Sequence, residues 1–456
     1  MKRIVKGLLW CCVLELIACT PVPVNTHQDI AKTSLSHLAW WNKLNDPRLN
    51  QLIKQALAKN TQLLEAKEKT LQAKAQLKAA YAAWLPTLSV AASGITAQGW
   101  DSHMTSNAGL TSLDSINTNA GYAGFMPAYS LNVLETMNNT RMAKASLAMQ
   151  RASYHALRLS IISQTAGAYF SLVGQKEQVQ HQKDYIVHLK KLYQLEYVRF
   201  KDGASDRSVM VALEQDIADS EAKRASLEYS VTHNQNALQL LIDQAPGVLA
   251  VNQSLARLDT NAVIPPDISA SVLKYRPDIM IAKERLNKAH ALVGLSYAAW
   301  FPNITLTGLL GGASLDLTQL LKLTTGLGAA QMAAQMSLFN APAYQQIQAS
   351  KAGVKAAGYS YLYTLRAALV DVENNLTQYE KKHEAAILQL NGYHAALRAY
   401  SLVMARYQSG LVDRRALLRA QLKVDQAQMN WAAAKIDELY ALVGVYQALA
   451  GGYRVN

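Results

Sequence analysis

The chain has 456 residues, of which 50% are hydrophobic and 17% are charged. This balance excludes an intrinsically disordered chain and gives enough length for two or three ordinary domains. A formal net charge of +13 permits nucleic-acid or acidic-surface partners, but no helix-turn-helix, zinc-finger or RNP pattern supports a nucleic-acid role. We therefore assign the charge to a long helical surface and expect no nucleic-acid partner.

The first 19 residues have the pattern of a bacterial secretion signal. The basic segment MKRIVKG precedes the mostly apolar LLWCCVLELIAC, which Glu15 interrupts. The segment ends in LIAC (residues 16–19), which resembles a lipobox, the motif whose cysteine becomes the acylated first residue of a lipoprotein. We predict a signal peptide over residues 1–18 and lipidation at Cys19. A plain signal peptide or a short apolar N-terminus is the alternative.

The next feature is a helical run that ends in YAAWLP (residues 81–86). Pro86 stops the helix because proline has no N–H to donate and clashes with the preceding turn. Tyr81 and Trp84 lie three residues apart on one helical face. We place them at the lipid–water boundary of a membrane, with packing between the helices and the strands as the alternative.

Alternating residues follow this junction and indicate a pair of strands. In TLSVAASGITAQ (residues 87–98), Leu88 and Val90 face away from Thr87 and Ser89. The segment GYAGFMPAYSLNV is a weaker match for the partner strand, which closes a strand pair over about 87–133. Strands of about 10 residues with weak alternation are typical of outer-membrane barrels, and a soluble β-hairpin is the alternative.

A proline-free tract of helix-forming residues covers 128–245. One helix from about Met137 to Lys201 would be roughly 100 Å long, which favours a coiled coil or helical barrel over a compact globule. The segment RFKDGASDR (199–207) interrupts the tract. Gly203 suits the left-handed backbone that ends a helix, so we predict two antiparallel helices with Gly203, Asp206 and Arg207 in their turn.

A linker over 246–277 leads into a second copy of the same order. YAAWFP (297–302) supplies Tyr297, Trp300 and Pro302, and a strand pair follows over about 303–339. A second proline-free tract is interrupted by RYQSGLVDR (406–414), which predicts a turn containing Gly410, Asp413 and Arg414. We therefore interpret the chain as an internal duplication, with one repeat over 19–245 and the other over 278–456.

Whole blocks of the sequence resemble the outer-membrane efflux factors, the TolC superfamily, and more closely its OprM/NodT lipoprotein branch. WWNKLNDPRLNQLIKQALAKN (40–60) and RPDIMIAKERLNKAHALVGLSYAAWFPNITLTG (276–308) are the most specific matches. NALQLLIDQAPG (236–247) and YQALAGG (446–452) extend the likeness to nearly all of residues 40–452.

The resemblance implies a mainly helical protomer with membrane strands, in a TolC-like trimeric α/β-barrel. Each protomer of the homotrimer would give four strands to a 12-stranded barrel and its long helix pairs to a periplasmic tunnel. The implied function is a passive exit channel in the bacterial outer membrane, anchored in the lipid bilayer at Cys19. It would dock with a periplasmic adaptor protein and with an inner-membrane pump of the RND type. Adaptor contacts are expected at the turns around Gly203 and Gly410.

Two other functions remain as alternatives. One is the exit duct of a type I protein-secretion system, and the other is a periplasmic coiled-coil scaffold. We expect no enzymatic activity, no cofactor and no metal, because no HExxH, P-loop or GxSxG motif occurs in a suitable context. His181 and His188 share a helical face without a third ligand, and we expect them to be solvated or to face the tunnel.

The sequence departs from the family at the starts of the two long helices. Asn132 and Glu135 replace the Asp and Gly of the usual Leu-Asp-x-x-Gly, and Asn340-Ala341-Pro342 replaces the usual Asp-Gly-Gly. Because asparagine caps helices and proline is tolerated in a first turn, we still expect helices to begin there.

A larger departure lies where the family closes its periplasmic aperture with Leu, Asp and Arg. Counting from Gly410, these positions hold Arg415, Arg419 and Leu422. Arg415 and Arg419 are four residues apart and share a helical face, so a trimer would carry rings of like charge. We predict a basic constriction that favours a dilated aperture or bound anions. Pairing of the arginines with Asp413 or Asp425, or exposure to solvent, is the alternative.

Overall fold

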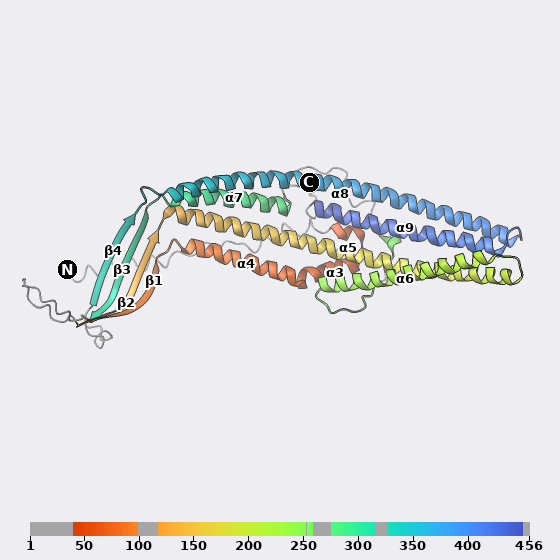
Figure 1. Ribbon diagram of the computed structural model, residues 1–456, viewed down its shortest axis with the longest axis horizontal. Helices are drawn as coiled ribbons and strands as arrows, with labels where there is room; N and C mark the ends of the chain where they lie inside the picture. Colours follow the sequence, from red (N-terminus) through yellow and green to blue (C-terminus); the bar gives the residue numbers. More distant parts are fainter. Residues whose placement is uncertain (1–39, 99–116, 252, 259–274, 315–325, 450–456) are drawn as a thin grey trace, which may run out of the picture.

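The computed structural model describes residues 40–98, 117–251, 253–258, 275–314 and 326–449. The molecule is elongated, with a sheet at one end and the turns of two helical hairpins at the other (Figure 1). The predicted signal peptide and Cys19 lie outside the described residues.

Four strands form one antiparallel sheet in the order β1-β2-β3-β4. They are β1 (Thr87–Gln98), β2 (Asn117–Leu131), β3 (Asn303–Ser314) and β4 (Gly326–Gln335). β1 and β3 occupy the ranges expected from their alternation, whereas β4 ends before residue 339. The reason is its pairing: β3 begins at Asn303, directly after Pro302, and Asn303 faces Gln335. Met336 and Leu338 therefore lie past the end of the strand.

The β2–β3 pairing joins the two halves of the chain. Phe125 faces Leu310, and Ala123 faces Gly312. The strands come close where two glycines meet, since a Cβ at Gly124 would lie 2.5 Å from the Cα of Gly311. This contact requires glycine, because a side chain at Gly124 would push the two strands apart.

The helices alternate with the strands along the chain. They are the 3-10 helices η1 (Trp40–Leu44) and η2 (Leu255–Arg257), and the α-helices α3 (Pro47–Lys59), α4 (Thr61–Ala82), α5 (Val133–Lys201), α6 (Arg207–Leu241), α7 (Pro277–Ala298), α8 (Ala341–Gln408) and α9 (Arg414–Ala448). Asparagines start the two longest ones: Asn132 accepts from Glu135 N at 3.1 Å, and Asn340 accepts from Ala343 N at 3.0 Å. The unusual residues at these positions are thus helix caps, as expected. No α-helix within the described ranges combines the length and apolar character that crossing a membrane requires.

The helices pack side by side in one layer that continues the sheet. Near the strands, α4 packs on α5, α5 on α7 and α7 on α8, which is the order of the strands attached to them (Figure 1). Towards the hairpin turns, α6 packs on α5, α5 on α9 and α9 on α8. As a result, α8 forms one edge of the layer along its whole length, and α4 and α6 form the other edge.

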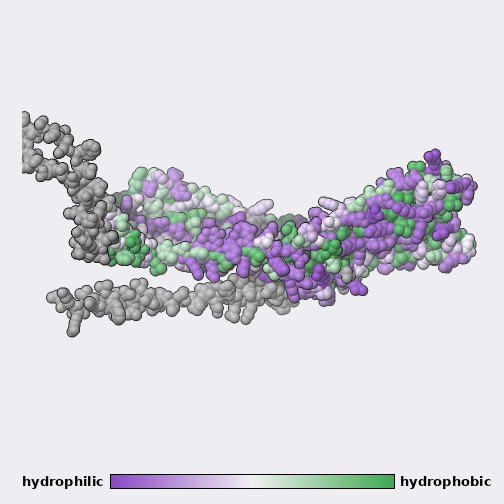
Figure 2. Space-filling model, turned by 90° about the horizontal axis from the view of Figure 1, so that it is seen from below, coloured by the Kyte–Doolittle hydropathy of each residue, from purple (hydrophilic) through white to green (hydrophobic). Residues whose placement is uncertain are grey.

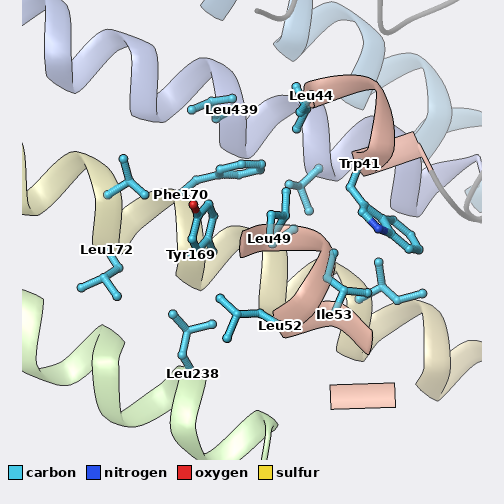
Figure 3. Packing of buried hydrophobic residues seen from close by; sticks show 14 of the residues in the cluster. Trp41, Leu44, Leu49, Leu52, Ile53, Tyr169, Phe170, Leu172, Leu238 and Leu439 are labelled. Atoms are coloured by element: carbon cyan, nitrogen blue, oxygen red, sulfur yellow. The ribbon is translucent and has the colours of Figure 1, made fainter. Parts of the chain in front are cut away.

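The main hydrophobic core lies midway along the molecule. Side chains of α3, including Leu49, Leu52 and Ile53, are fully buried against Tyr169 and Phe170 of α5 (Figure 3). Near them, Trp40 stacks on Tyr446 with ring centroids 4.5 Å apart. Asp46 caps α3 and accepts a hydrogen bond from the Tyr169 hydroxyl at 2.5 Å. The WWNKLNDPRLNQLI block therefore supplies the segment that closes this core.

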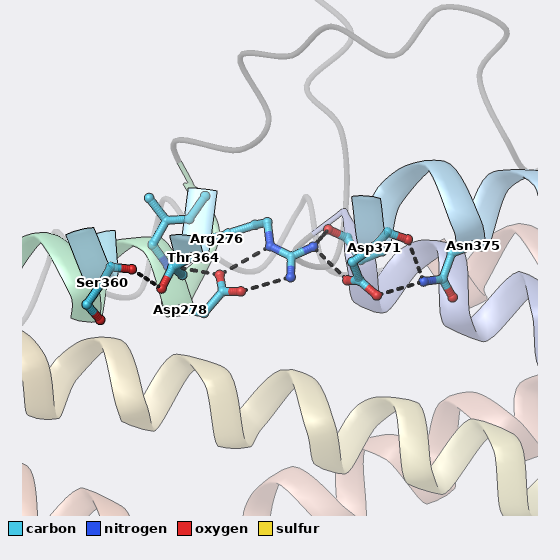
Figure 4. Close-up of polar contacts among 8 residues, drawn as sticks. Arg276, Asp278, Ser360, Thr364, Asp371 and Asn375 are labelled. Carbon is cyan, nitrogen blue, oxygen red and sulfur yellow. Dashed lines mark hydrogen bonds and ion pairs between the residues drawn. The ribbon is translucent and has the colours of Figure 1, made fainter. Parts of the chain in front are cut away.

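Arg276 fixes the start of the second repeat. Its Nη1 donates to Asp371 Oδ2 at 2.9 Å and to the carbonyl of Ala448 at 2.7 Å, and its Nη2 donates to Asp278 Oδ2 at 2.8 Å (Figure 4). One guanidinium thus ties the first turn of α7 to α8 and to the C-terminal end of α9. The Arg276-Pro277-Asp278 triplet therefore holds the start of α7 in place.

Candidate functional site

The sheet has one apolar face. Residues directly opposite each other in an antiparallel ladder point to the same side, so the pairs Val90–Phe125 and Phe125–Leu310 form one apolar row across three strands. The exposed apolar residues on this face are Leu88, Val90, Phe125, Ile304, Leu306, Leu310 and Met332. Val90 is 74% exposed and Met332 is 75% exposed. An apolar surface of this size on a lone sheet is a contact surface for lipid or protein.

The opposite face of the sheet is mostly polar. Thr87 and Ser89 donate to the carbonyls of Ala128 and Met126, each at 3.1 Å. Ser130 faces Thr305 and donates to Asn303 Oδ1 at 3.1 Å. The sheet therefore separates an apolar face from a mostly polar face, as the alternation in β1 and β3 predicted.

The two helix-to-strand junctions are built alike. Trp84 N donates to the carbonyl of Tyr81 at 3.2 Å, and Trp300 N donates to the carbonyl of Tyr297 at 3.0 Å. Pro86 and Pro302 follow two residues after the tryptophans, and β1 and β3 begin at the next residue. The tyrosines and Trp84 are exposed and Trp300 is half-buried. Seen from below, hydrophobic residues gather at the sheet end, while hydrophilic residues cover much of the helical part (Figure 2).

At the far end, the two hairpin turns share one backbone design. Gly203 and Gly410 have φ of +73° and +74°, the left-handed conformation that glycine adopts most readily. Each glycine N–H bonds three residues back, and the next residue bonds five residues back, which is the Schellman ending of a helix. Asp206 and Asp413 then cap α6 and α9 by accepting from Ser208 N and Ala416 N. Arg207 and Arg414 are the first residues of these helices.

An ionic cluster ties the two turns together around Glu196, which is only 1% exposed. Ser205 donates to its Oε2 at 2.8 Å, and Arg199 Nε lies 3.7 Å away. Arg415 of the other hairpin reaches Glu196 Oε1 at 3.7 Å and Asp413 at 3.4 Å. Sequence spacing gave no sign of this cluster, because Glu196 and Arg415 belong to different repeats.

The three residues at the family's aperture positions have different surroundings in the single chain. Arg415 is held in the ionic cluster, and its partner Asp413 is one of the acids considered from the sequence. Arg419 is exposed. Leu422 is half-buried and packs against a small core of Leu189, Leu192, Leu213 and Leu418.

His188 has a partner that the sequence did not reveal. Its Nδ1 lies 2.6 Å from Oδ2 of the buried Asp425 on α9. Because α5 and α9 pack together there, His188 is half-buried and paired and not simply solvated. That it faces the tunnel stays a prediction. Burial lowers the pKa of His181, two turns earlier. Within the described residues, no group of three or more His, Cys, Asp or Glu side chains is placed to hold a metal ion.

Comparison with known proteins agrees with this architecture. A family model described as outer membrane efflux protein matches residues 52–243 and 268–451. The probable outer membrane lipoprotein SilC of Salmonella typhimurium is 25% identical over 449 residues, which cover 95% of this chain and 94% of SilC. The cation efflux system protein CusC of Escherichia coli K12 is 24% identical over 98% of this chain and 99% of its own length.

The solved structure of the outer-membrane channel OprN matches with a TM-score of 0.80 at 23% identity, covering 91% of this chain and 93% of that one. The fold is thus TolC-like. Together with the match to the family model over most of the chain, this shows that the protein belongs to the outer membrane efflux protein family and is an efflux channel of the outer membrane.

Proposed function

We propose that three copies of this protein form a passive conduit from the periplasm to the cell exterior, within a tripartite efflux system that also contains a periplasmic adaptor and an inner-membrane pump of the RND type. The observation that carries this proposal is the division of the sheet into an exposed apolar face and a polar face. Lipid covers the apolar face and water fills the space on the polar face. The protein performs no chemistry of its own.

The open edges of the single chain support the homotrimer. β1 and β4 are the edge strands of the sheet, and α8 forms one edge of the helical layer opposite α4 and α6. Free strand edges are normally paired or covered. If the β4–α8 edge of one copy meets the β1–α4–α6 edge of the next, three four-stranded sheets close into one ring with no free edge.

The composition of these edges supports contact between copies. α8 exposes large apolar residues, among them Tyr359, Tyr363 and Leu388, and the opposite edge exposes Leu71 of α4 and Tyr229 of α6. α8 carries seven Arg or Lys residues and four acidic residues, whereas α6 carries three Arg or Lys residues and five acidic residues. Opposite charge and exposed apolar surface both favour contact between copies.

The remaining site assignments follow from this arrangement. The membrane interface lies at the two junctions, and the residues assigned to it are Tyr81, Trp84, Pro86, Tyr297, Trp300 and Pro302. The hairpin turns lie at the opposite end, away from the membrane, which makes them the docking surface for the adaptor. The residues assigned to docking are Gly203, Asp206, Arg207, Gly410, Asp413 and Arg414. Lipidation at Cys19 would anchor the N-terminus in the same bilayer.

A charge placed on either face of one strand tests the proposal. Leu306 and Thr305 are neighbours on β3, and both are partnered in the ladder. Leu306→Lys puts an ammonium group on the apolar face and should cost about 2–4 kcal/mol if that face meets lipid at mid-depth. Thr305→Lys puts the same group on the polar face and should be tolerated.

The measurement is the yield of heat-modifiable oligomer in outer-membrane fractions. We expect a strong loss for Leu306→Lys and little change for Thr305→Lys. Equal yields from the two variants would mean that lipid does not cover the apolar face.

A further inference from the structure

The two hairpin tips share a backbone design but differ sharply in charge. Aligned on their glycines, the α5–α6 tip covers residues 199–216 and the α8–α9 tip covers residues 406–423. The first contains three Arg or Lys residues and four acids, a net charge of −1. The second contains five Arg or Lys residues and one acid, Asp413, a net charge of +4. The positive charge therefore belongs to one hairpin and not to the tip end in general.

Four of the five cations on the second tip are available to solution. Arg415 is the exception, since it lies in the ionic cluster with Asp413 and Glu196. Arg406, Arg414, Arg419 and Lys423 are exposed, and none of them forms an ion pair with a carboxylate in the part of the chain that the structure describes. We call these four residues the basic collar.

Three members of the basic collar lie on α9, close enough for their electric fields to add. Arg414, Arg419 and Lys423 lie within ten residues of α9, roughly 14 Å from end to end at 1.5 Å per residue. Charges within about a Debye length, ~10 Å at 0.1 M salt, reinforce one another. No charged residue lies in any of the four strands. The four strands therefore contribute no fixed charge that opposes that of the tip.

We propose that the basic collar makes the periplasmic end of the channel selective for anions, so that negatively charged solutes enter more readily than positively charged ones. This inference rests on the proposed function, because it requires a conduit that opens between the tips of three copies. Three copies would place twelve uncompensated cations around one opening. A mouth lined by one sign of charge concentrates counter-ions and raises their rate of entry. The basic constriction then consists of Arg419, as the sequence predicted, together with Arg406, Arg414 and Lys423. Arg415 is left out because its charge is neutralised by its neighbours.

Reversal potentials in planar lipid bilayers test this directly, with the full-length protein and K⁺ and Cl⁻ as the probe ions. A tenfold KCl gradient at low ionic strength gives the permeability ratio of Cl⁻ to K⁺. We expect a ratio above one for the wild-type protein. In the tip variant R406Q/R414Q/R419Q/K423Q, we expect the ratio to fall several-fold.

A matched control removes the same charge elsewhere. Lys54 and Lys59 of α3 and Lys283 and Arg285 of α7 are exposed and lie outside the tip end and outside the two edges of the helical layer. The variant K54Q/K59Q/K283Q/R285Q should keep the wild-type ratio. If it lowers the ratio as much as the tip variant does, selectivity comes from net charge and the inference fails.

The remaining outcomes separate the inference from the proposed function. A wild-type channel that conducts but prefers K⁺, or a tip variant with an unchanged ratio, overturns the inference and leaves the conduit intact. A correctly assembled wild-type protein with no conductance overturns the proposed function itself. If the tip variant does not assemble, the salt dependence of the wild-type channel tests the inference. Its permeability ratio must approach one as KCl rises towards 1 M, because the Debye length is then about 3 Å and the fixed charges are screened. A permeability ratio that does not change with KCl concentration would contradict the proposed role of the basic collar.

Discussion

His188 on α5 and Asp425 on α9 form a 2.6 Å contact between Nδ1 and Oδ2, in the seam where the two hairpins pack together. A second contact of the same kind lies further along α9. There, His383 of α8 meets Glu438 at 2.7 Å. The two pairs differ in what else holds the carboxylate: Lys435 lies 2.9 Å from Glu438, whereas Asp425 also accepts from the neutral amide of Gln421. α9 is therefore attached to both of its neighbours through a histidine and a buried carboxylate.

Replacing each histidine by phenylalanine should separate these two contacts. His188→Phe leaves the buried Asp425 without its histidine, which should cost about 1.5–3 kcal/mol, the value for a lost hydrogen bond to a charged group. His383→Phe should cost less, because Lys435 still neutralises Glu438 and a phenyl ring can keep the stacking on Tyr379. Thermal unfolding followed by tryptophan fluorescence measures both variants. An equal drop in Tm would show that Lys435 does not compensate.

Glycine has opposite effects at two sites on or next to α8. Gly410 needs its positive φ, and a methyl group there would meet nothing within 4 Å. Gly410→Ala should therefore destabilise the protein by about 1 kcal/mol through backbone strain alone. Gly353 lies inside the helix with equally open surroundings. Gly353→Ala should stabilise the protein by up to about 1 kcal/mol, because alanine is the better helix former.

The same unfolding assay checks both signs. If Gly410→Ala is neutral, the turn does not depend on the left-handed conformation. If Gly353→Ala destabilises the assembled protein, that face of α8 packs against a neighbour too closely for a methyl group.

Acid should weaken the protein through His155. Burial lowers the pKa of this histidine, and the nearby Arg158 and Arg151 lower it further. A histidine with a lowered folded pKa binds its proton more weakly in the folded chain than in the unfolded chain. Its contribution to stability is therefore complete above the unfolded value of about 6.5 and is lost as the pH falls below it. Each extra proton bound on unfolding costs at most about 1.4 kcal/mol per pH unit.

His155→Gln removes this proton uptake and should reduce the loss of stability between pH 7.5 and pH 5.5. The measurement is the difference between the Tm values at these two pH values, compared with that of the wild type. An unchanged difference would assign the acid sensitivity to other groups, of which His181 is the first candidate because burial also lowers its pKa.

Local features were predictable from the sequence because neighbouring residues determine them. The left-handed glycines of both turns, the asparagine caps of α5 and α8, and the alternation in β1 and β3 all depend on residues within a few positions of each other. The end of β4 was misplaced because the alternation continues to residue 338, whereas the register with β3 stops at Gln335.

Contacts between the repeats were not predictable in this way. The Phe125–Leu310 register, the Glu196–Arg415 ion pair and the His188–Asp425 contact each join residues about 200 positions apart. Internal duplication indicates that the halves are alike, but it does not give the register in which they pack. The contact of Arg415 is an example, since its partner Glu196 belongs to the other hairpin.

A charge introduced on the α8 edge should interfere with the assembly of three copies. Tyr363 is 75% exposed in the single chain, so replacing it by glutamate removes little packing within the protomer. If three copies close edge to edge, the new carboxylate is buried against the neighbouring copy and loses its hydration, which costs several kcal/mol without a partner. Tyr363→Glu should therefore shift the protein from the trimer towards the monomer.

Leu411 supplies the matched control for this prediction. It is also 75% exposed, but it lies at the hairpin tip and not on the layer edge. Leu411→Glu should leave the oligomer intact, because the tip remains in water when the edges close. Native mass spectrometry of the detergent-solubilised protein distinguishes the species by mass. A Tyr363→Glu protein that remains trimeric would place the contact between copies on another surface, and a Leu411→Glu protein that dissociates would place it at the tips.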